Sequence, residues 1–325
     1  MSDNKGILII VEVKDGKLSP VAAELFGAAQ SIDAALTEGI SAVAFGNRAR
    51  SAAGLLGNLG AAKVFTAETS EATASSASSS VEKLTAEVKP RFILMVENDL
   101  GSDLAPLLAA RLNTAAVTSV ISMLVDSGKV IITRPVYGGN ALADFTIETE
   151  PQIISIRPKA FTPAVIDENR KTEIVELPPV ESSLGVRVIE RISRKDEGPK
   201  IEEAKVVVGG GRGLGGPEGF AQLKELADLL GGSVGASRPP CDQGWWPERS
   251  QIGVTGKTIA PELYIAVGIS GSSQHLSGVS GAKTVVAINK DAEANIFKAA
   301  AYGVTGDWKK VVPALIAKVK ELTGR

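Results

Sequence analysis

The sequence predicts an α/β fold made of two domains. Short apolar runs alternate with helix-length segments in the first part of the chain, and the same alternation restarts after residue 200. Such alternation is typical of parallel sheets joined by right-handed crossover helices. The length of 325 residues suits two domains, at roughly 100–200 residues each. A charged segment with a Gly-Pro step, residues 194–200, is predicted to link a domain of residues 1–193 to a domain of residues 201–325.

The first domain begins with strands and helices in turn. Ser19 and Pro20 are typical of a helix start, as N-cap and first-turn residues, and Gly39 is typical of a helix end. The predicted strands are Ile7–Val13, Ile40–Phe45, Ala62–Thr66, Phe92–Val96 and Ala115–Ser119. The predicted helices are Pro20–Ala35, Arg48–Leu56, a segment that ends at Val88, and Leu104–Leu112.

Two segments of this domain allow more than one interpretation. Ser70–Ser80 holds six serines. We interpret it as an exposed stretch of weak helix propensity that leads into Val81–Val88, with a disordered low-complexity insert as the alternative. Glu97, Asp99 and Asp103 follow a predicted strand, where either an acid/base pair or helix capping near Ser102 explains them.

From residue 130 the strand patterns follow one another without intervening helices. Val130–Pro135, Ala143–Thr149 and Gln152–Arg157 are predicted to form an antiparallel elaboration of the first sheet, with turn residues between them. Residues 160–180 contain several prolines and show no helical periodicity. Val186–Arg191 alternates like one more strand.

The second domain repeats the α/β pattern. The predicted strands are Lys205–Val208, Ser233–Gly235, Leu263–Val267 and Thr284–Ile288. A helix is predicted over Pro217–Leu230, ended by Gly231, and a last helix over Trp308–Leu322. Pro313 is predicted to mark a kink or a restart in that last helix, because proline lacks the N–H that a helix interior needs.

Composition narrows the function before any motif is considered. The net charge is −2, and aromatic residues make up 4% of the chain, which argues against nucleic acid as a partner. A single cysteine, Cys241, excludes an intramolecular disulfide, and a single histidine, His275, excludes any site that needs two imidazoles. We expect no metal site, no membrane-spanning segment and a cytoplasmic location.

A glycine-rich loop opens the second domain. Gly211, Gly213 and Gly216 match a G-x-G-x-x-G pattern between a strand and a helix, where backbone N–H groups can approach a phosphate. The carboxylate that a dinucleotide site places about 20 residues later is missing, because the next strand reads Ser-Val-Gly-Ala-Ser-Arg over 233–238. The pattern therefore disfavours a nicotinamide site, and Arg212 indicates an anionic ligand.

Four more loops follow, or lie close to, predicted strands of this domain. They contain small residues, hydroxyls and single cations, and they cover residues 235–238, 251–257, 268–275 and 288–291. Open α/β sheets bind ligands outside the carboxyl ends of their strands. Together the loops predict a nucleotide-sized binding site at that edge.

Three longer segments carry a resemblance to a known family. Residues 234–245, 253–278 and 286–297 closely resemble the α subunit of electron transfer flavoprotein, and the first domain matches more loosely. The resemblance implies a first domain with an adenine-nucleotide hydrolase-like fold. It also implies a doubly wound second domain that binds FAD, and a heterodimer with the family's β subunit.

The resemblance also assigns residues to the cofactor. Arg212, Ser237 and Arg238 match flavin-contacting positions, and Ile252, Gly253, Val254 and Thr255 match the loop whose threonine hydroxyl lies at flavin N5. Ser270, Gly271, Ser272, Ser273, Gln274 and His275 match the loop around the flavin and its ribityl-pyrophosphate chain, with the histidine near O2. Asn289 matches a phosphate-side contact, and Asp307 with Trp308 match the pair at the adenosine end.

The function that the resemblance implies is electron carriage, with no substrate of the protein's own. Electrons would pass from acyl-CoA-type or other dehydrogenases through FAD to a membrane quinone reductase or another acceptor. One alternative is the electron-bifurcating, NADH-oxidising form of the family. A second alternative is an NAD(P)H-binding reductase built on the glycine loop.

Overall fold

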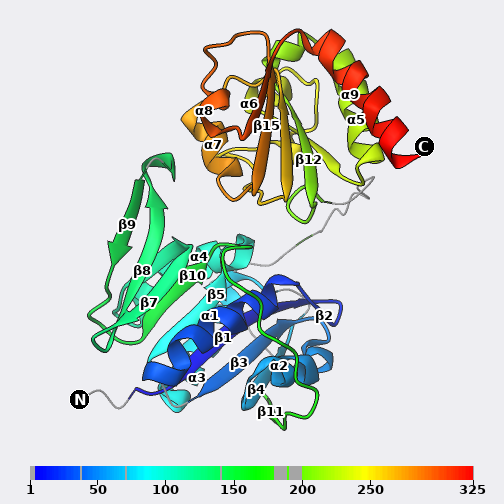
Figure 1. Ribbon diagram of the computed structural model, residues 1–325. Helices are drawn as coiled ribbons and strands as arrows, with labels where there is room; N and C mark the ends of the chain where they lie inside the picture. Colours follow the sequence, from blue (N-terminus) through cyan, green and yellow to red (C-terminus); the bar gives the residue numbers. More distant parts are fainter. Residues whose placement is uncertain are drawn as a thin grey trace. The chain divides into compact units, whose positions relative to one another are not determined.

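The computed structural model describes residues 4–36, 39–69, 72–139, 141–178, 189 and 200–324. The chain divides into two compact units near residue 192, both drawn in Figure 1. The predicted linker, residues 194–200, lies outside the described residues except for Lys200. The strand predicted at Val186–Arg191 also lies outside them, apart from Ile189. The domain boundaries therefore stay predictions.

An eight-stranded sheet forms the core of the first unit. Its order is β11-β4-β3-β1-β5-β10-β6, with β2 paired to β1. Every pairing is parallel except that of β1 with β2. The strands are β1 (Ile7–Lys14), β2 (Lys17–Leu18), β3 (Ile40–Gly46), β4 (Lys63–Glu68), β5 (Phe92–Val96), β6 (Ala116–Val120), β10 (Gln152–Ile156) and β11 (Glu173–Glu176).

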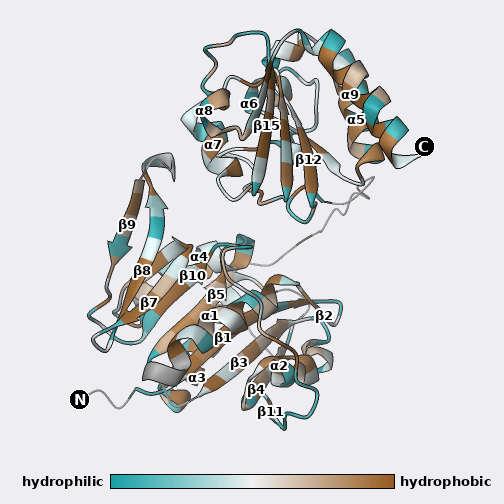
Figure 2. Cartoon of the chain, in the orientation of Figure 1, coloured by the Kyte–Doolittle hydropathy of each residue, from teal (hydrophilic) through white to brown (hydrophobic). Residues whose placement is uncertain are grey.

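Helices cover both faces of this sheet. They are α1 (Val21–Leu36), α2 (Ala53–Leu59), α3 (Ala74–Val88) and α4 (Asp99–Arg111), with a short 3-10 turn η1 (Ala49–Ala52). A further 3-10 turn, η2 (Tyr137–Gly139), is not part of this cover. Ile7 and Ile9 of β1 face the core under α1 and α2, while Leu8 faces the core under α3 and α4. Because both faces are covered, β1 is an almost continuous apolar run. Figure 2 shows such brown strands between the helices.

The prediction of an antiparallel elaboration is correct in part. β7 (Ser122–Asp126), β8 (Lys129–Val136) and β9 (Ala141–Phe145) form a separate three-stranded sheet, in which β7 and β8 are antiparallel. The prediction is wrong for β10, which lies parallel between β5 and β6. All five residues of β10 are buried, as a central parallel strand requires.

The serine-rich stretch and the acidic stretch are both parts of helices. Thr73 begins α3 with a capping box to Ser76, and Ser78 is fully buried with its hydroxyl bonded to the Ser75 carbonyl at 2.9 Å. The interpretation of an exposed stretch is therefore wrong for the described part, because small hydroxyls bonded to helix carbonyls can be buried. Asn98, rather than a residue near Ser102, caps α4.

The second unit contains a five-stranded parallel sheet in the order β13-β12-β14-β15-β16. The strands are β12 (Val206–Gly210), β13 (Ser233–Ala236), β14 (Leu263–Val267), β15 (Thr284–Asn289) and β16 (Tyr302–Thr305). The edge strand β16 lies in a segment for which the sequence predicts no strand. All four of its residues are exposed, so it lacks the buried apolar pattern that marks the other four.

Helices again pack on both faces, and the fold is the predicted α/β arrangement. They are α5 (Glu218–Leu229), α6 (Arg238–Asp242), α7 (Ser273–Val279), α8 (Ile296–Ala299) and α9 (Trp308–Thr323), with 3-10 turns η3 (Arg212–Leu214) and η4 (Glu248–Ser250). The helix α9 continues through Pro313, so the predicted restart is wrong. Across the described ranges, each helix is too short or too polar to cross a membrane.

Candidate functional site

The strand order of the second unit places a ligand crevice at one edge of its sheet. The chain passes from β12 outward to β13, then returns to the other side of β12 at β14. Such a reversal opens a crevice outside the carboxyl ends of the two strands on either side of it. The loops that begin at Gly211 and Gly268 leave β12 and β14 at this point.

The structure brings the predicted site residues to this edge. Each predicted group follows the carboxyl end of a strand or is joined to one, because Gln251 forms a β-bridge with Ala236 at the end of β13. The residues gathered there are Arg212, Ser237, Arg238, Ile252, Gly253, Val254, Thr255, Ser270, Gly271, Ser272, Ser273, Gln274, His275, Asn289, Asp307 and Trp308.

The glycine loop packs against the loop after β14. The N–H of Gly211 donates to the Val267 carbonyl at 2.9 Å, and that of Gly213 donates to the Gly268 carbonyl at 3.0 Å. A Cβ at Gly211 would lie 2.2 Å from the Gly268 oxygen. These glycines let two loops touch, and their N–H groups are already bonded. The expectation that this pair of N–H groups faces a phosphate is therefore wrong, and the exposed Arg212 is left as the loop's cation.

The loop from Ile252 to Thr255 is held at its base and open at its tip. Ile252 is buried and its N–H donates to the Ala236 carbonyl at 2.8 Å. Val254 and Thr255 are exposed. The Gln251 side-chain amide donates to Thr255 Oγ1 at 3.0 Å, which leaves the hydroxyl hydrogen of Thr255 free to donate to a ligand.

The loop from Ser270 to Gln274 exposes a group of polar side chains. Ser270, Ser272, Ser273 and Gln274 are all exposed. Gly271 has a φ of +81°, and a Cβ there would lie 2.2 Å from the Ile296 backbone nitrogen. Glycine therefore allows this loop to lie against the start of α8 while its hydroxyls stay open to a ligand.

His275 differs from its neighbours because it is buried. Its Nε2 lies 2.8 Å from the Tyr264 hydroxyl oxygen, and its Nδ1 lies 3.2 Å from the Ile252 carbonyl oxygen. Burial lowers the pKa of His275 to about 4, so the imidazole is neutral at pH 7. Both ring nitrogens have partners inside the protein.

Tyr264 is a residue that sequence analysis missed. It is fully buried in β14, and burial raises the pKa of its hydroxyl. One sequence signal was available: a tyrosine in the otherwise aliphatic strand 263–267 needs a polar partner for its hydroxyl.

The remaining predicted contacts have structural partners. Arg238 pairs with Asp242 at 3.2 Å, and both side chains are exposed. The Asn289 amide donates to the Ile269 carbonyl at 2.8 Å. Asp307 caps α9 by accepting from the Lys309 N–H at 3.0 Å, and Trp308 packs in the core under α5. Their contacts to a cofactor stay predictions.

The surroundings of Cys241 disfavour a reactive thiolate. Burial, together with the nearby carboxylates of Asp242 and Glu248, raises the pKa of its thiol to about 11. A thiol with such a pKa is protonated at pH 7 and is a poor nucleophile.

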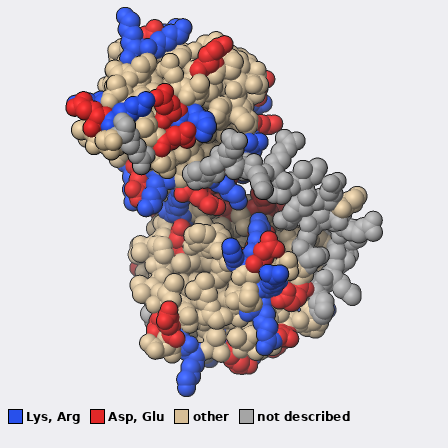
Figure 3. Space-filling model, turned by 90° about the vertical axis from the view of Figure 1, so that its right-hand side faces the viewer, with Lys and Arg blue, Asp and Glu red and all other residues tan. Residues whose placement is uncertain are grey.

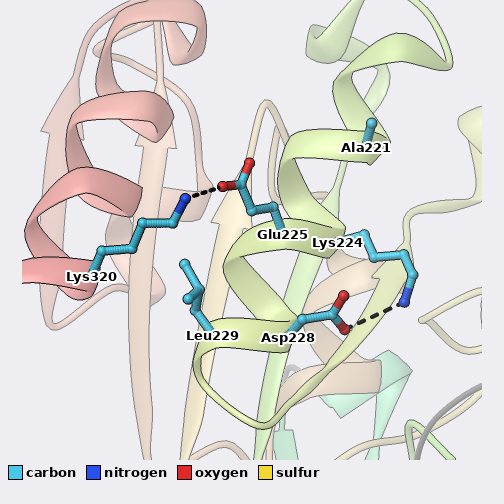
Figure 4. A pocket seen from close by; sticks show the side chains of 6 residues that line it. All are labelled: Ala221, Lys224, Glu225, Asp228, Leu229 and Lys320. Atoms are coloured by element: carbon cyan, nitrogen blue, oxygen red, sulfur yellow. Dashed lines mark hydrogen bonds and ion pairs between the residues drawn. The ribbon is translucent and has the colours of Figure 1, made fainter. Parts of the chain in front are cut away.

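A shallow hollow on α5 and α9 is separate from this edge (Figure 4). Its lining includes Lys224, Asp228 and Lys320. Lys224 pairs with Asp228 at 3.3 Å, and Lys320 pairs with Glu225 at 2.7 Å. Because α5 runs back from the carboxyl edge of the sheet, its last turn lies at the opposite edge. The hollow offers paired charges, while the carboxyl edge offers exposed hydroxyls.

Comparison with known protein families identifies the ligand class of the second unit. Residues 7–182 match the family pattern described as the electron transfer flavoprotein domain, and residues 200–280 match the one described as the electron transfer flavoprotein FAD-binding domain. The chain belongs to the electron transfer flavoprotein family. Its second unit is therefore an FAD-binding domain, and its first unit carries the family's other domain.

Similar proteins extend this assignment over nearly the whole chain. An electron transfer flavoprotein subunit alpha from Thermoanaerobacterium thermosaccharolyticum is 39% identical over 99% of this chain and 100% of its own length. One from Bacillus subtilis is 39% identical over 98% of both chains. A protein named FixB from Clostridium saccharobutylicum is 37% identical over 99% of this chain and 98% of its own.

The residues at the edge fit FAD. A dinucleotide needs cations or N–H donors for its pyrophosphate and donors around its ring and ribityl hydroxyls. The edge offers the exposed guanidinium groups of Arg212 and Arg238, the free hydroxyl hydrogen of Thr255, and the exposed loop 270–274. These groups lie at the position in the fold where open α/β sheets bind nucleotides.

Proposed function

We propose that this chain is the FAD-carrying subunit of a heterodimeric electron carrier. It takes electrons from partner dehydrogenases, of the acyl-CoA type or another, and passes them to a quinone reductase or another acceptor. FAD supplies the redox chemistry when it is bound. The protein holds the cofactor and presents it to its partners.

The observation that carries this proposal is that the imidazole and three carboxylates of the edge already have partners within the protein. Both nitrogens of His275 are bonded inside the protein. Asp242 pairs with Arg238, Asp307 caps a helix, and Asp291 accepts from the Glu293 N–H at 3.0 Å. General acid–base catalysis needs a side chain that can reach a substrate proton. Such an edge suits a carrier better than an enzyme that transforms a substrate.

Within this proposal, different edge residues contact different parts of FAD. Arg212, Ser237 and Arg238 would hold the flavin and pyrophosphate, and Thr255 would donate to the ring. Ser270, Ser272 and Ser273 would line the ribityl-pyrophosphate chain. Asn289, Asp307 and Trp308 would border the adenosine end.

A β subunit completes the proposed carrier. The relatives named above as subunit alpha support such a partner, because that name implies a further subunit. The three-stranded sheet offers a contact surface: Leu124 and Leu142, from two of its strands, are 62% and 63% exposed, and exposed apolar side chains gathered in one small sheet are typical of a protein–protein interface. Figure 3 shows basic and acidic side chains interspersed on the face drawn.

The test is a flavin count followed by an electron-transfer assay. The chain is co-expressed with a β subunit of the family, and FAD is counted per purified heterodimer. Under anaerobic conditions the complex is mixed either with an acyl-CoA dehydrogenase and its substrate or with NADH alone. We expect one FAD and flavin bleaching only with the dehydrogenase. Two FAD molecules and direct reduction by NADH would favour the bifurcating form. One FAD and reduction by NAD(P)H alone would favour a reductase.

A further inference from the structure

A tyrosine and the chain's single histidine form a buried pair in the FAD-binding domain. Tyr264 is 0% exposed and His275 is 4% exposed. The Tyr264 hydroxyl oxygen lies 2.8 Å from His275 Nε2, and His275 Nδ1 lies 3.2 Å from the Ile252 carbonyl oxygen. The three residues therefore form a chain of two hydrogen bonds that runs from β14 through α7 to the loop at Gly253.

The chemistry of these partners fixes the direction of both bonds. A carbonyl oxygen only accepts, so Nδ1 of His275 must carry the ring hydrogen. A neutral imidazole has one N–H, so Nε2 accepts and the Tyr264 hydroxyl donates. Removal of the tyrosine hydroxyl would leave Nε2 as a buried acceptor without a donor, and the ring would lose one of the two hydrogen bonds that hold it in place.

The surrounding backbone makes room for the pair. A Cβ at Gly209 of β12 would lie 2.1 Å from the Tyr264 hydroxyl oxygen. The hydroxyl is thus seated between two neighbouring strands, where only glycine leaves space for it. A phenylalanine at 264 would keep the ring in this place but remove the hydroxyl and its hydrogen bond.

The histidine of the pair is bonded to the loop that carries Thr255. Gly253, at a φ of +147°, packs against Gly278 of α7, where a Cβ would lie 2.5 Å from the Gly253 nitrogen. The Val254 N–H donates to the Gln274 carbonyl at 3.0 Å. Together with the His275 bond to Ile252, these contacts tie three successive residues of the loop to α7.

We infer that Tyr264 is a positioning residue of the FAD site. Its hydroxyl holds the His275 ring in place, and His275 holds the Ile252 carbonyl, so that Thr255 is presented to the flavin ring in a fixed place. The inference rests on the proposed contact between Thr255 and the flavin. It does not depend on which dehydrogenase or acceptor the carrier serves.

The first experiment reads the tautomer directly. Because His275 is the chain's single histidine, ¹⁵N-histidine labelling of this subunit, assembled with an unlabelled β subunit and FAD, gives one imidazole spectrum. We expect the wild-type complex to show the Nδ1–H tautomer alone, with Nε2 as a hydrogen-bonded acceptor. Tyr264→Phe should keep that tautomer but shift the Nε2 resonance to that of an acceptor without a donor. Tyr302→Phe is the matched control, because Tyr302 is 68% exposed.

The second experiment measures FAD binding by equilibrium dialysis of the same complexes. Tyr264→Phe should raise the FAD dissociation constant about tenfold, or ~1.4 kcal/mol, and Tyr302→Phe should leave it unchanged. His275→Asn keeps an N–H near the Nδ1 position, whereas His275→Gln places its amide near Nε2. We expect His275→Asn to retain more FAD affinity than His275→Gln, since the bond to Ile252 positions the loop.

Three results would overturn the inference. One is a mixed tautomer in the wild-type complex, and another is a Tyr264→Phe complex identical to Tyr302→Phe in both measurements. If Tyr264→Phe does not fold, the histidine variants decide, and equal or better FAD binding by His275→Gln is the contrary result. A wild-type complex that binds FAD but accepts no electrons from a dehydrogenase would contradict the proposed carrier and leave this inference standing.

Discussion

The two units are both parallel sheets with helices on both faces, yet their carboxyl edges differ in chemistry. The strand order reverses in the first unit between β1 and β5, as it does in the second between β12 and β14. At the first reversal, Glu12 bonds to Lys14 at 3.1 Å and to the Asn98 amide at 3.3 Å, while Glu97 accepts from the Ser119 hydroxyl. Acidic groups there are occupied by neighbours.

The second edge shows the opposite arrangement. Its loops meet through glycines, and they leave hydroxyls and guanidinium groups exposed around the crevice. The same strand reversal thus accompanies the proposed FAD site in one unit and a set of internally bonded carboxylates in the other. The comparison shows that topology offers a location for a ligand, and that the loop residues decide whether one is bound.

The largest expected effect comes from closing the contact between the two glycine loops. In Gly211→Ala the new Cβ would lie 2.2 Å from the Gly268 oxygen. The two loops must move apart to remove this clash, which costs about 3 kcal/mol of stability. FAD should bind about 100-fold more weakly, as measured by dialysis. The matched control is Gly54→Ala on α2 of the first unit, where nothing lies within 4 Å of the new Cβ. Wild-type affinity in Gly211→Ala would contradict the packing role.

The next effect is a loss of local stability at acid pH in the second unit. Burial lowers the pKa of His275 to about 4 from its ordinary 6.5. The unfolded chain therefore binds a proton as pH falls through 6.5, while the folded chain does not do so until about pH 4. Stability falls across that window, by about 2 kcal/mol between pH 7 and pH 5.

Hydrogen exchange of β14 amides in the holo complex, corrected for intrinsic rates, measures this loss. His275→Asn should show a smaller loss, because it has no imidazole to protonate. The amides of β3 in the first unit provide the internal comparison. An equal pH response in wild type and His275→Asn would argue against a buried, neutral histidine.

A smaller effect is expected on the flavin's midpoint potential. Reduction adds negative charge to the ring, and a nearby cation stabilises that charge. Arg238→Gln should therefore lower the two-electron potential by about 30 mV, or ~1.4 kcal/mol, and by more than His275→Asn does. Arg170→Gln in the first unit is the control, because Arg170 is also half-exposed and paired, with Asp167 at 3.5 Å. An unchanged potential in Arg238→Gln would show that its charge does not reach the ring.

The smallest expected effect is in the first unit, where acidification should raise stability rather than lower it. Burial raises the pKa of Glu24, which accepts from the Lys159 backbone N–H at 2.5 Å. The folded chain thus takes up this proton before the unfolded chain does as pH falls, so the contribution of Glu24 to stability increases on acidification through its folded pKa. Glu24→Gln should remove that increase, as read from exchange of the Ala164 N–H, which is bonded to the Ala23 carbonyl at 2.8 Å. A persistent increase in the variant would assign it to another group.

Sequence analysis anticipated most elements of both sheets and the loops that gather at the carboxyl edge of the second sheet. Buried parallel strands such as β1 and β14 are recognisable because they are uniformly apolar. Strand β16 was not predicted, because all its residues are exposed and it lacks a buried apolar run. The serines of α3 were wrongly predicted to be exposed, because their burial depends on hydrogen bonds to helix carbonyls, which composition does not reveal.

By itself the sequence determined the α/β class, the family resemblance and the set of loops that could meet a nucleotide, since all of these depend on local patterns. Only the tertiary structure decided that β10 lies between β5 and β6, that Gly211 lies against Gly268, and that His275 bonds to Tyr264 and Ile252. The physical reason is that these contacts join segments far apart in the chain. Periodicity shows which face of a strand or helix is buried, while the partner that a buried polar group finds depends on how the strands are ordered and on what the neighbouring strands leave room for.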